Sequence, residues 1–223
     1  MAMKKQILLL SAVVLSSMAM AQSSPSFSIR AGIASSDMRG DAVNSLNNIL
    51  DFTDGMIATK SRTGFFAGAS AAIPVSENIS IEPGLYYTQK GYELKGELGL
   101  KAIDFLGVNA KAALNTSYID LPILVKGNFG GLELFAGPQV SYLTNAELRT
   151  TAGALGFNVV DSRVDANNQF NKWDAAITGG IGYQFNGGLN IRASYDHGIL
   201  KADANRNLDT YNRSLKLGIG LRF

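Results

Sequence analysis

The sequence has 223 residues, of which 46% are hydrophobic and none is cysteine. This composition excludes a disulfide-stapled miniprotein, a Cys-based zinc module and a thiol enzyme. The formal charge of +2 comes from 20 Lys and Arg against 18 Asp and Glu, and the two extra bases are Lys4 and Lys5. Residues 22–223 are therefore neutral, so net charge gives no reason to expect nucleic-acid binding or electrostatic attraction to a membrane.

Residues 1–21 have the layout of a cleaved secretory signal. Lys4 and Lys5 precede the apolar run Ile7–Leu15, and Ala19 and Ala21 are the small residues that a signal peptidase reads. The run is shorter than the ~20 residues that a membrane-spanning helix needs. We predict export with cleavage after Ala21, which leaves residues 22–223 as one domain.

The remaining chain shows eight runs in which apolar and polar residues alternate with a period of two, as in half-buried β-strands. The runs cover residues 27–34, 62–75, 79–90, 118–126, 132–142, 173–185, 189–196 and 214–223. One face of every run is free of charge. The opposite face carries Arg30, Glu82, Lys90, Asp120, Lys126, Glu133, Asp174, Arg192, Asp196, Lys216 and Arg222.

The connections between the runs alternate in length. Residues 76–78, 127–131 and 186–188 are short turns, whereas residues 37–61, 91–115, 144–171 and 197–212 are longer and more polar. This predicts an all-β fold, an eight-stranded antiparallel up-and-down transmembrane β-barrel with short periplasmic turns and long extracellular loops. Aromatic residues fall at both ends of the strands as two girdles: Phe27, Tyr183, Phe185 and Phe223 at the short turns, and Phe65, Tyr87, Tyr142, Trp173 and Tyr195 at the long loops.

A soluble periplasmic ligand-binding barrel of lipocalin type is the competing fold, because alternation alone does not tell the inside from the outside. The polar face is rich in Gly, Ala and Ser, and a soluble exterior normally carries far more charge. These features, together with the two girdles, favour the membrane barrel.

Three stretches resemble the PorT-like outer-membrane β-barrel family of Gram-negative bacteria. The resemblance implies the barrel fold and an outer-membrane location but says little about activity. The namesake's role in secretion and gliding does not transfer, since the long loops show no matching motif. The stretches are Glu82 to Gly91, then Tyr118 to Lys126 with Leu134 to Pro138, and finally Asp174, Gly180, Gly182, Tyr183 and Phe185 with Leu217 to Phe223.

An eight-stranded barrel is narrow enough for side chains to fill it. We therefore expect Phe66, Tyr86, Tyr118 and Phe135 to block a continuous channel, and the inward charges to form a structural network of ion pairs. A narrow gated ion path is the alternative interpretation.

Three further patterns are candidate sites. The only histidine, His197, lies near Ser194 and Asp196, but parity points it away from them, so a catalytic triad is not expected. Residues 203–209 carry oxygen side chains at every second position, although Leu208, Ser214 and Arg206 argue against calcium. The pairs Gly180/Gly182 and Gly218/Gly220 lie inside strands with no following helix, which favours close packing over nucleotide binding.

Apolar residues in two long connections suggest contact surfaces. Leu46, Ile49 and Leu50 have helical spacing, and residues 98–106 contain Leu98, Leu100, Ile103, Phe105 and Leu106. The second group is a candidate protein-contact surface, but either group could equally form strand extensions or a cap on the barrel rim.

We therefore expect a non-enzymatic integral protein of the outer membrane, with no cofactor, no metal and no catalytic residue. Its expected partners are outer-membrane lipid and, through the long loops, envelope or secretion proteins. The alternatives are a narrow ion or solute channel, an outer-membrane lipid-modifying enzyme and the soluble ligand-binding barrel.

Overall fold

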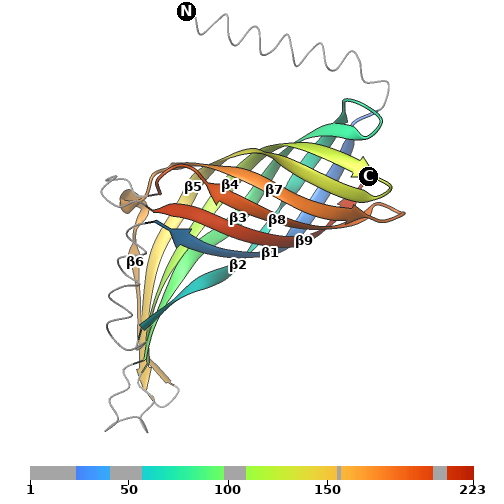
Figure 1. Ribbon diagram of the computed structural model, residues 1–223. Helices are drawn as coiled ribbons and strands as arrows, with labels where there is room; N and C mark the ends of the chain where they lie inside the picture. The colour runs from blue at the N-terminus through green and yellow to red at the C-terminus, as the bar shows by residue number, and fades with distance from the viewer. Residues whose placement is uncertain (1–23, 41–56, 98–108, 155–156, 203–209) are drawn as a thin grey trace, which may run out of the picture.

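The computed structural model describes residues 24–40, 57–97, 109–154, 157–202 and 210–223, and these residues are almost entirely β-sheet (Figure 1). In chain order the elements are β1 (Ser26–Arg39), β2 (Ile57–Pro74), β3 (Ile79–Glu97), β4 (Asn109–Phe129), β5 (Leu132–Ala154), β6 (Phe157–Asp165), the 3-10 helix η2 (Asn167–Gln169), β7 (Trp173–Gln184), β8 (Leu189–Gly198) and β9 (Tyr211–Arg222).

Eight strands, β1–β5 and β7–β9, close into an antiparallel barrel, which confirms the predicted fold. β5 pairs with β7 because β6 leaves the wall, and β9 pairs with β1 to complete the ring. The closing seam joins the first and last strands at their ends. The Phe27 N–H donates to the Phe223 carbonyl oxygen at 3.0 Å, and the Phe223 N–H donates to the Phe27 carbonyl oxygen at 2.9 Å.

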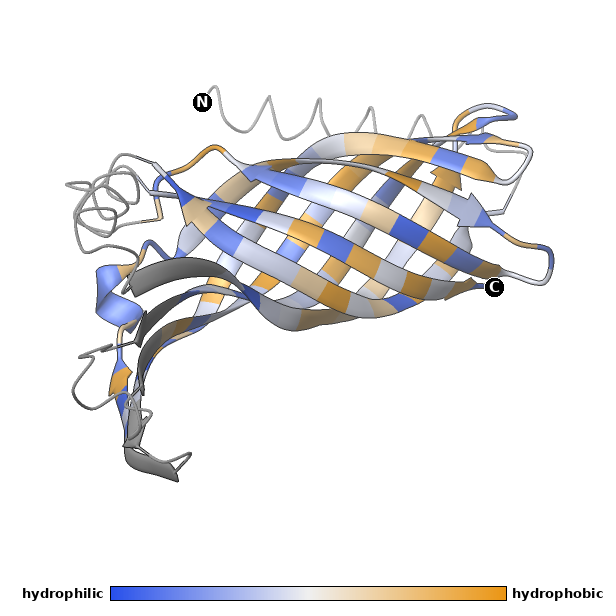
Figure 2. Cartoon of the chain, turned by 60° about the horizontal axis from the view of Figure 1, so that its bottom comes forward, coloured by the Kyte–Doolittle hydropathy of each residue, from blue (hydrophilic) through white to orange (hydrophobic). Residues whose placement is uncertain are grey.

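The barrel is apolar outside and polar inside, and hydrophobic and hydrophilic residues alternate along its strands (Figure 2). Leu217 and Ile219 of β9, for example, are 51% and 62% exposed. The uncharged outer face of β1 runs from Phe27 to Ser35, and Asp37 ends it. This stretch of nine residues, of which every second one faces outward, matches the ~9–11 residues that a tilted strand needs to cross a bilayer.

Aromatic side chains form the two predicted girdles. Except for the half-buried Tyr87, they are exposed on the outer face at each end of the barrel, where an amphipathic ring suits a membrane–water interface. Several contact each other around the ring of strands. By ring-centroid distance the contacts are Phe65–Tyr87 at 5.7 Å, Tyr142–Trp173 at 5.0 Å and Tyr183–Phe185 at 4.9 Å.

The strand glycines make room for aromatic rings inside the barrel. A Cβ on Gly218 would lie 2.5 Å from Cζ of Phe66, and a Cβ on Gly180 would lie 2.5 Å from Cζ of Phe135. Both separations are far below van der Waals contact, so no other residue fits at either position without displacing the ring. Close packing, as the sequence indicated, therefore explains these glycines.

Strands continue into all four long connections, and they occupy much of residues 91–115 and 144–171 as far as these are described. β6 was missed entirely, although it forms a hairpin with the outer half of β5. Together these segments build an open sheet beyond one wall of the barrel, which turns sharply away from the barrel axis (Figures 1 and 2). We call this sheet the extension: residues 57–61 of β2, 92–97 of β3, 109–115 of β4, 145–154 of β5, and β6.

Arg222, assigned to the inner face by parity, lies at the short-turn mouth of the barrel, where it borders an open pocket together with Lys126 and Ala72. It is exposed because the mouth is open, and its backbone N–H donates to the Gly188 carbonyl oxygen at 2.9 Å. Among the described residues, no helix is both long and apolar enough to cross a membrane.

Candidate functional site: the lumen and the extension

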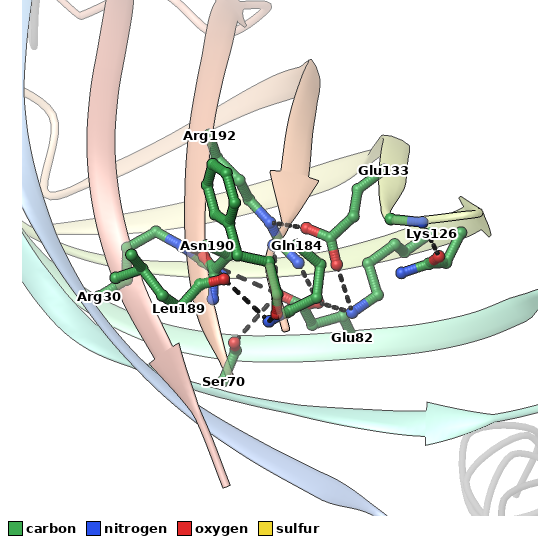
Figure 3. Close-up of polar contacts among 12 residues, drawn as sticks. Arg30, Ser70, Glu82, Lys126, Glu133, Gln184, Leu189, Asn190 and Arg192 are labelled. Atoms are coloured by element: carbon green, nitrogen blue, oxygen red, sulfur yellow. Dashed lines mark hydrogen bonds and ion pairs between the residues drawn. The ribbon is translucent and has the colours of Figure 1, made fainter. Parts of the chain in front are cut away.

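The end of the lumen near the short turns holds a compact cluster of charges (Figure 3). Arg192 donates to both carboxylate oxygens of Glu82, at 2.6 and 2.9 Å, and to Glu133 at 2.7 Å. Lys126 lies 2.8 Å from Glu82 and 3.4 Å from Glu133. Arg30 adds a third cation, 3.7 Å from Glu82. Three cations therefore face two carboxylates, all of them buried.

Neutral groups complete this lower cluster. The Ser70 hydroxyl donates to Glu82 at 3.0 Å, and Arg30 donates to the Tyr86 hydroxyl at 2.8 Å and to the side-chain amide oxygen of Asn190 at 3.3 Å. A buried carboxylate with several donors keeps its charge despite the loss of water. The predicted structural ion-pair network is therefore present.

Aromatic rings cross the lumen above the lower cluster. Phe66, Tyr86 and Phe135 are all buried, and the ring planes of Phe66 and Tyr86 meet edge to face at 6.2 Å between centroids. A cavity of about 50 Å³ remains among them, bordered also by Leu124 and Arg192. That volume holds a few waters.

A second charge cluster lies toward the long loops. Asp120 is fully buried. Its carboxylate accepts hydrogen bonds from Lys90 at 3.0 Å, from Lys216 at 2.9 Å and from the Ser141 hydroxyl at 2.6 Å. Lys216 also lies 2.7 Å from Asp196. With Asp174 included, this upper cluster contains three carboxylates and two lysines. Its net charge is therefore opposite in sign to that of the lower cluster. Among the described residues, the ten buried charges of the two clusters cancel.

A hydrophobic cap closes the lumen above the upper cluster. Tyr118 and Leu143 are each only 1% exposed and pack with Met38 and Leu114. Residues 166–172, which we call the strap, follow β6 at this rim, and Ala166 and Phe170 pack against the cap. The strap is held by backbone hydrogen bonds from the Ala166 N–H to the Ala146 carbonyl oxygen, from the Leu143 N–H to the Lys172 carbonyl oxygen, and from the Asn171 N–H to the Ala202 carbonyl oxygen.

We expect the barrel to be non-conducting, because two ion-pair clusters, an aromatic layer and an apolar cap lie in series along the lumen. Single-channel recording of the purified protein in planar bilayers should show no resolved openings at neutral pH. The double variant Phe66→Ala/Tyr118→Ala removes one ring from the aromatic layer and one from the cap, and should raise leak currents. Steady openings of the unmodified barrel would contradict the closed lumen.

The extension is the part of the chain that lies outside the uncharged band. Leu148 of β5 faces Val164 of β6 across the sheet, and they are 40% and 56% exposed. On the other face Arg149 donates to both carboxylate oxygens of Asp161, at 2.9 and 2.7 Å. These hydrogen bonds lower the pKa of the Asp161 carboxyl. The extension is thus a solvated, hydrogen-bonded platform that presents both apolar and charged side chains.

The structure does not bring His197 together with the neighbouring polar residues. His197 points outward and accepts a hydrogen bond from Arg39 at 2.8 Å. Asp196 points into the lumen, toward Lys216 and the Thr178 hydroxyl, and Ser194 borders the central cavity. Parity anticipated this separation, and no Ser–His–Asp geometry forms.

Several sequence predictions lie outside the described residues: the signal segment 1–21, the possible calcium loop 203–209, the contact candidate 98–106, and the helical spacing of Leu46, Ile49 and Leu50. Within the described part of the chain, no group of His, Asp and Glu side chains is arranged to hold a metal ion.

Sequence reasoning missed the strap and β6. Only the pair Val159 and Val160, followed by Arg163 and Val164, hinted at a strand inside residues 144–171. That signal is weak because both faces of such a strand meet water.

Comparison with known proteins identifies the family. The model of the family described as outer membrane protein beta-barrel domain matches residues 20–203. The chain belongs to this family and is an outer-membrane β-barrel protein. No curated protein matches the sequence.

Solved structures of small outer-membrane barrels are similar in arrangement. Ail, the attachment invasion locus protein of Yersinia pestis, has 14% identity and a TM-score of 0.46, over 90% of this chain and all of Ail. Neisserial surface protein A has 13% identity and a TM-score of 0.41, over 90% and 100% of the two chains. OprG from Pseudomonas aeruginosa has 15% identity and a TM-score of 0.43, over 90% and 96%. Likenesses this distant concern at most the fold.

Proposed function

We propose that this outer-membrane barrel is a non-enzymatic surface protein whose extension contacts other proteins outside the cell. The observation that carries the proposal is the combination of a closed lumen with a long ordered sheet beyond one wall. A barrel that served only as a pore would need neither the strap nor β6. Edge strands and exposed apolar side chains at the end of a rigid scaffold are typical of protein-contact surfaces.

The proposal also covers the export of the protein, its family likeness, its contact with lipid and its partners. We propose that residues 1–21 are removed after Ala21 during export, that the protein is PorT-like, and that lipid covers its outer band. Its partners are envelope or secretion proteins. The lumen supports a role without catalysis, because its carboxylates are engaged by cations or amides.

The orientation can be tested by cysteine labelling, because the native chain has no cysteine. Asn168→Cys places a thiol in η2 at the long-loop end, and Asn78→Cys places one in a short turn, and both positions are exposed. In intact cells a membrane-impermeant maleimide should label the first variant and spare the second, and both should react after lysis. Labelling of only Asn78→Cys in intact cells would reverse the orientation and overturn the proposal.

The contact function can be tested by removing the outer hairpin. Ala146 and Ala166 are joined by a backbone hydrogen bond of 2.9 Å, so an Asn-Gly turn between them replaces residues 147–165 without strain on the barrel. Proximity labelling from Asn168→Cys in cells should lose protein neighbours in the shortened variant, while heat-modifiable mobility is kept. An unchanged set of labelled proteins would count against the extension as the contact surface.

A further inference from the structure

β6 is an open sheet edge. It is the last strand in the order of the sheet, and among the described residues only β5 pairs with it. From Asp161 to Asp165 every residue is exposed, so neither face of this stretch is covered. An exposed edge with unpaired backbone groups is a template for a further strand.

The hydrogen-bond pattern shows which backbone groups are free. The Ala166 N–H donates to the Ala146 carbonyl oxygen, which marks that pair as a hydrogen-bonded rung. Such rungs alternate in an antiparallel ladder. The register Leu148↔Val164 continues the alternation, so the N–H and C=O groups of Asp161, Arg163 and Asp165 point away from β5.

The side chains of these three residues share one face and alternate in sign. Protective edges usually carry like charges, lysine above all, which repel a second copy. Here a negative, a positive and a negative charge follow each other at Asp161, Arg163 and Asp165. Asp165 is already engaged at the end of the strand, since the backbone N–H of Asn167 donates to it at 2.8 Å and the side-chain amide at 3.0 Å. Asp161 accepts from Arg149 within the hairpin, at 2.9 and 2.7 Å, but its exposed carboxylate has lone pairs for a second cation. Asp161 and Arg163 flank Ser162 and are the two charges that a new strand would meet there.

We propose that the occupant of this edge is β6 of a second copy, added antiparallel about a two-fold axis through Ser162. In this register Asp161 pairs with Arg163 of the partner subunit, and Arg163 pairs with the partner's Asp161. Both members of each pair have outward backbone groups, as a hydrogen-bonded rung requires. The proposal rests on the placement of the extension outside the membrane, and it names one partner of that surface.

The geometry of the extension is compatible with such a pair. The sheet turns away from the barrel axis, so β6 lies across that axis rather than along it (Figure 1). Two barrels in one membrane can then point the same way while their β6 strands run antiparallel. Confinement of both barrels to the membrane raises their effective concentration, which helps a contact as small as one strand pair.

Disulfide trapping tests the register directly. Ser162 meets its own counterpart at the two-fold axis in a rung without hydrogen bonds, where Cα atoms lie ~4.5 Å apart, within the range for a disulfide. Ser162→Cys should therefore form a dimer in the outer membrane under mild oxidation. The matched control is Thr150→Cys, which is equally exposed and lies opposite Ser162, one strand further from the edge. It should yield about tenfold less dimer, because three strand spacings separate its thiol from the same thiol of the partner.

Charge exchange tests the pairing independently. In the Ser162→Cys background, Asp161→Arg gives an edge with two positive charges, and Arg163→Asp gives one with two negative charges. Each variant expressed alone should lose most of its disulfide-linked dimer. Co-expression of the two variants should restore a mixed dimer, at about tenfold the yield of either homodimer, because opposite charges again face each other. Distinct tags and retained heat-modifiable mobility identify the mixed, folded species.

The outcomes separate this inference from the proposed function. Equal dimer yield from Ser162→Cys and Thr150→Cys, or no gain on co-expression, would overturn the second copy as the occupant. Trapping of a different protein at Ser162→Cys would overturn it as well, while leaving the extension as a contact surface. If the impermeant maleimide does not label Asn168→Cys in intact cells, the extension does not face the outside. Both the pairing with a second copy and the proposed contact function would then be contradicted.

Discussion

Replacing Glu82 by alanine should destabilise the folded barrel by about 3–5 kcal/mol, because the change leaves buried cations without their shared carboxylate. Arg192 would keep only Glu133, and Lys126 would keep only its longer contact to Glu133 at 3.4 Å. Urea titration of the heat-modifiable folded band in detergent micelles measures the loss. Glu82 is only 2% exposed, so solvent cannot replace it without opening the lumen.

Glu77→Ala is the matched control for this result. Glu77 is the same residue type but is exposed in the turn between β2 and β3, and its removal should leave the midpoint unchanged. A Glu82→Ala barrel as stable as its parent would mean that water or rearranged partners already satisfy Arg192 and Lys126. The lower cluster would then not be a stabilising feature.

Replacing Leu217 by arginine should cost about 2–4 kcal/mol in a lipid bilayer, since Leu217 lies near the middle of the outer band of β9 and a charge there must leave water. Reversible unfolding in phospholipid vesicles, followed by tryptophan fluorescence of Trp173, measures the difference. Leu217 is 51% exposed to the surroundings, so the cost reflects lipid rather than a lost protein core.

Val164→Arg is the contrasting variant. Val164 is similarly exposed, at 56%, but lies on the extension, where its surroundings are water. The stability of its barrel should stay within about 0.5 kcal/mol of the parent. A soluble barrel of lipocalin type would tolerate both substitutions alike, so equal stability of the two variants would contradict the membrane barrel.

The barrel strands were predictable because their two faces meet different surroundings. Leu215 to Phe223, for instance, alternates strictly since lipid lies on one side of β9 and a polar lumen on the other. The extension escaped prediction for the opposite reason. Strand β6 has water on both faces, so Asp161 to Asp165 carries charges at every second position but only one apolar residue, Val164, and its hairpin depends on the pairing with β5.

The candidate site was predictable only in part. Parity placed Glu82 and Arg192 on the inner face, but the two are 110 residues apart in sequence, and only barrel closure brings them to 2.6 Å. The cap depended on an extra residue in β5, where the register shifts between Ser117 and Tyr118 of β4. No pattern in the sequence signals that shift.

The sequence by itself determined which side chains face lipid and which face the lumen, because a strand exposes alternate residues to its two sides and charge is expelled from hydrocarbon. It also determined that the lumen carries enough side chains to be filled. The tertiary structure alone decided which charges pair, how the strap packs against the cap, and that β5 and β6 continue as an open-edged sheet. Those features depend on contacts between residues far apart in the chain, which form only once the barrel has closed and its register is set.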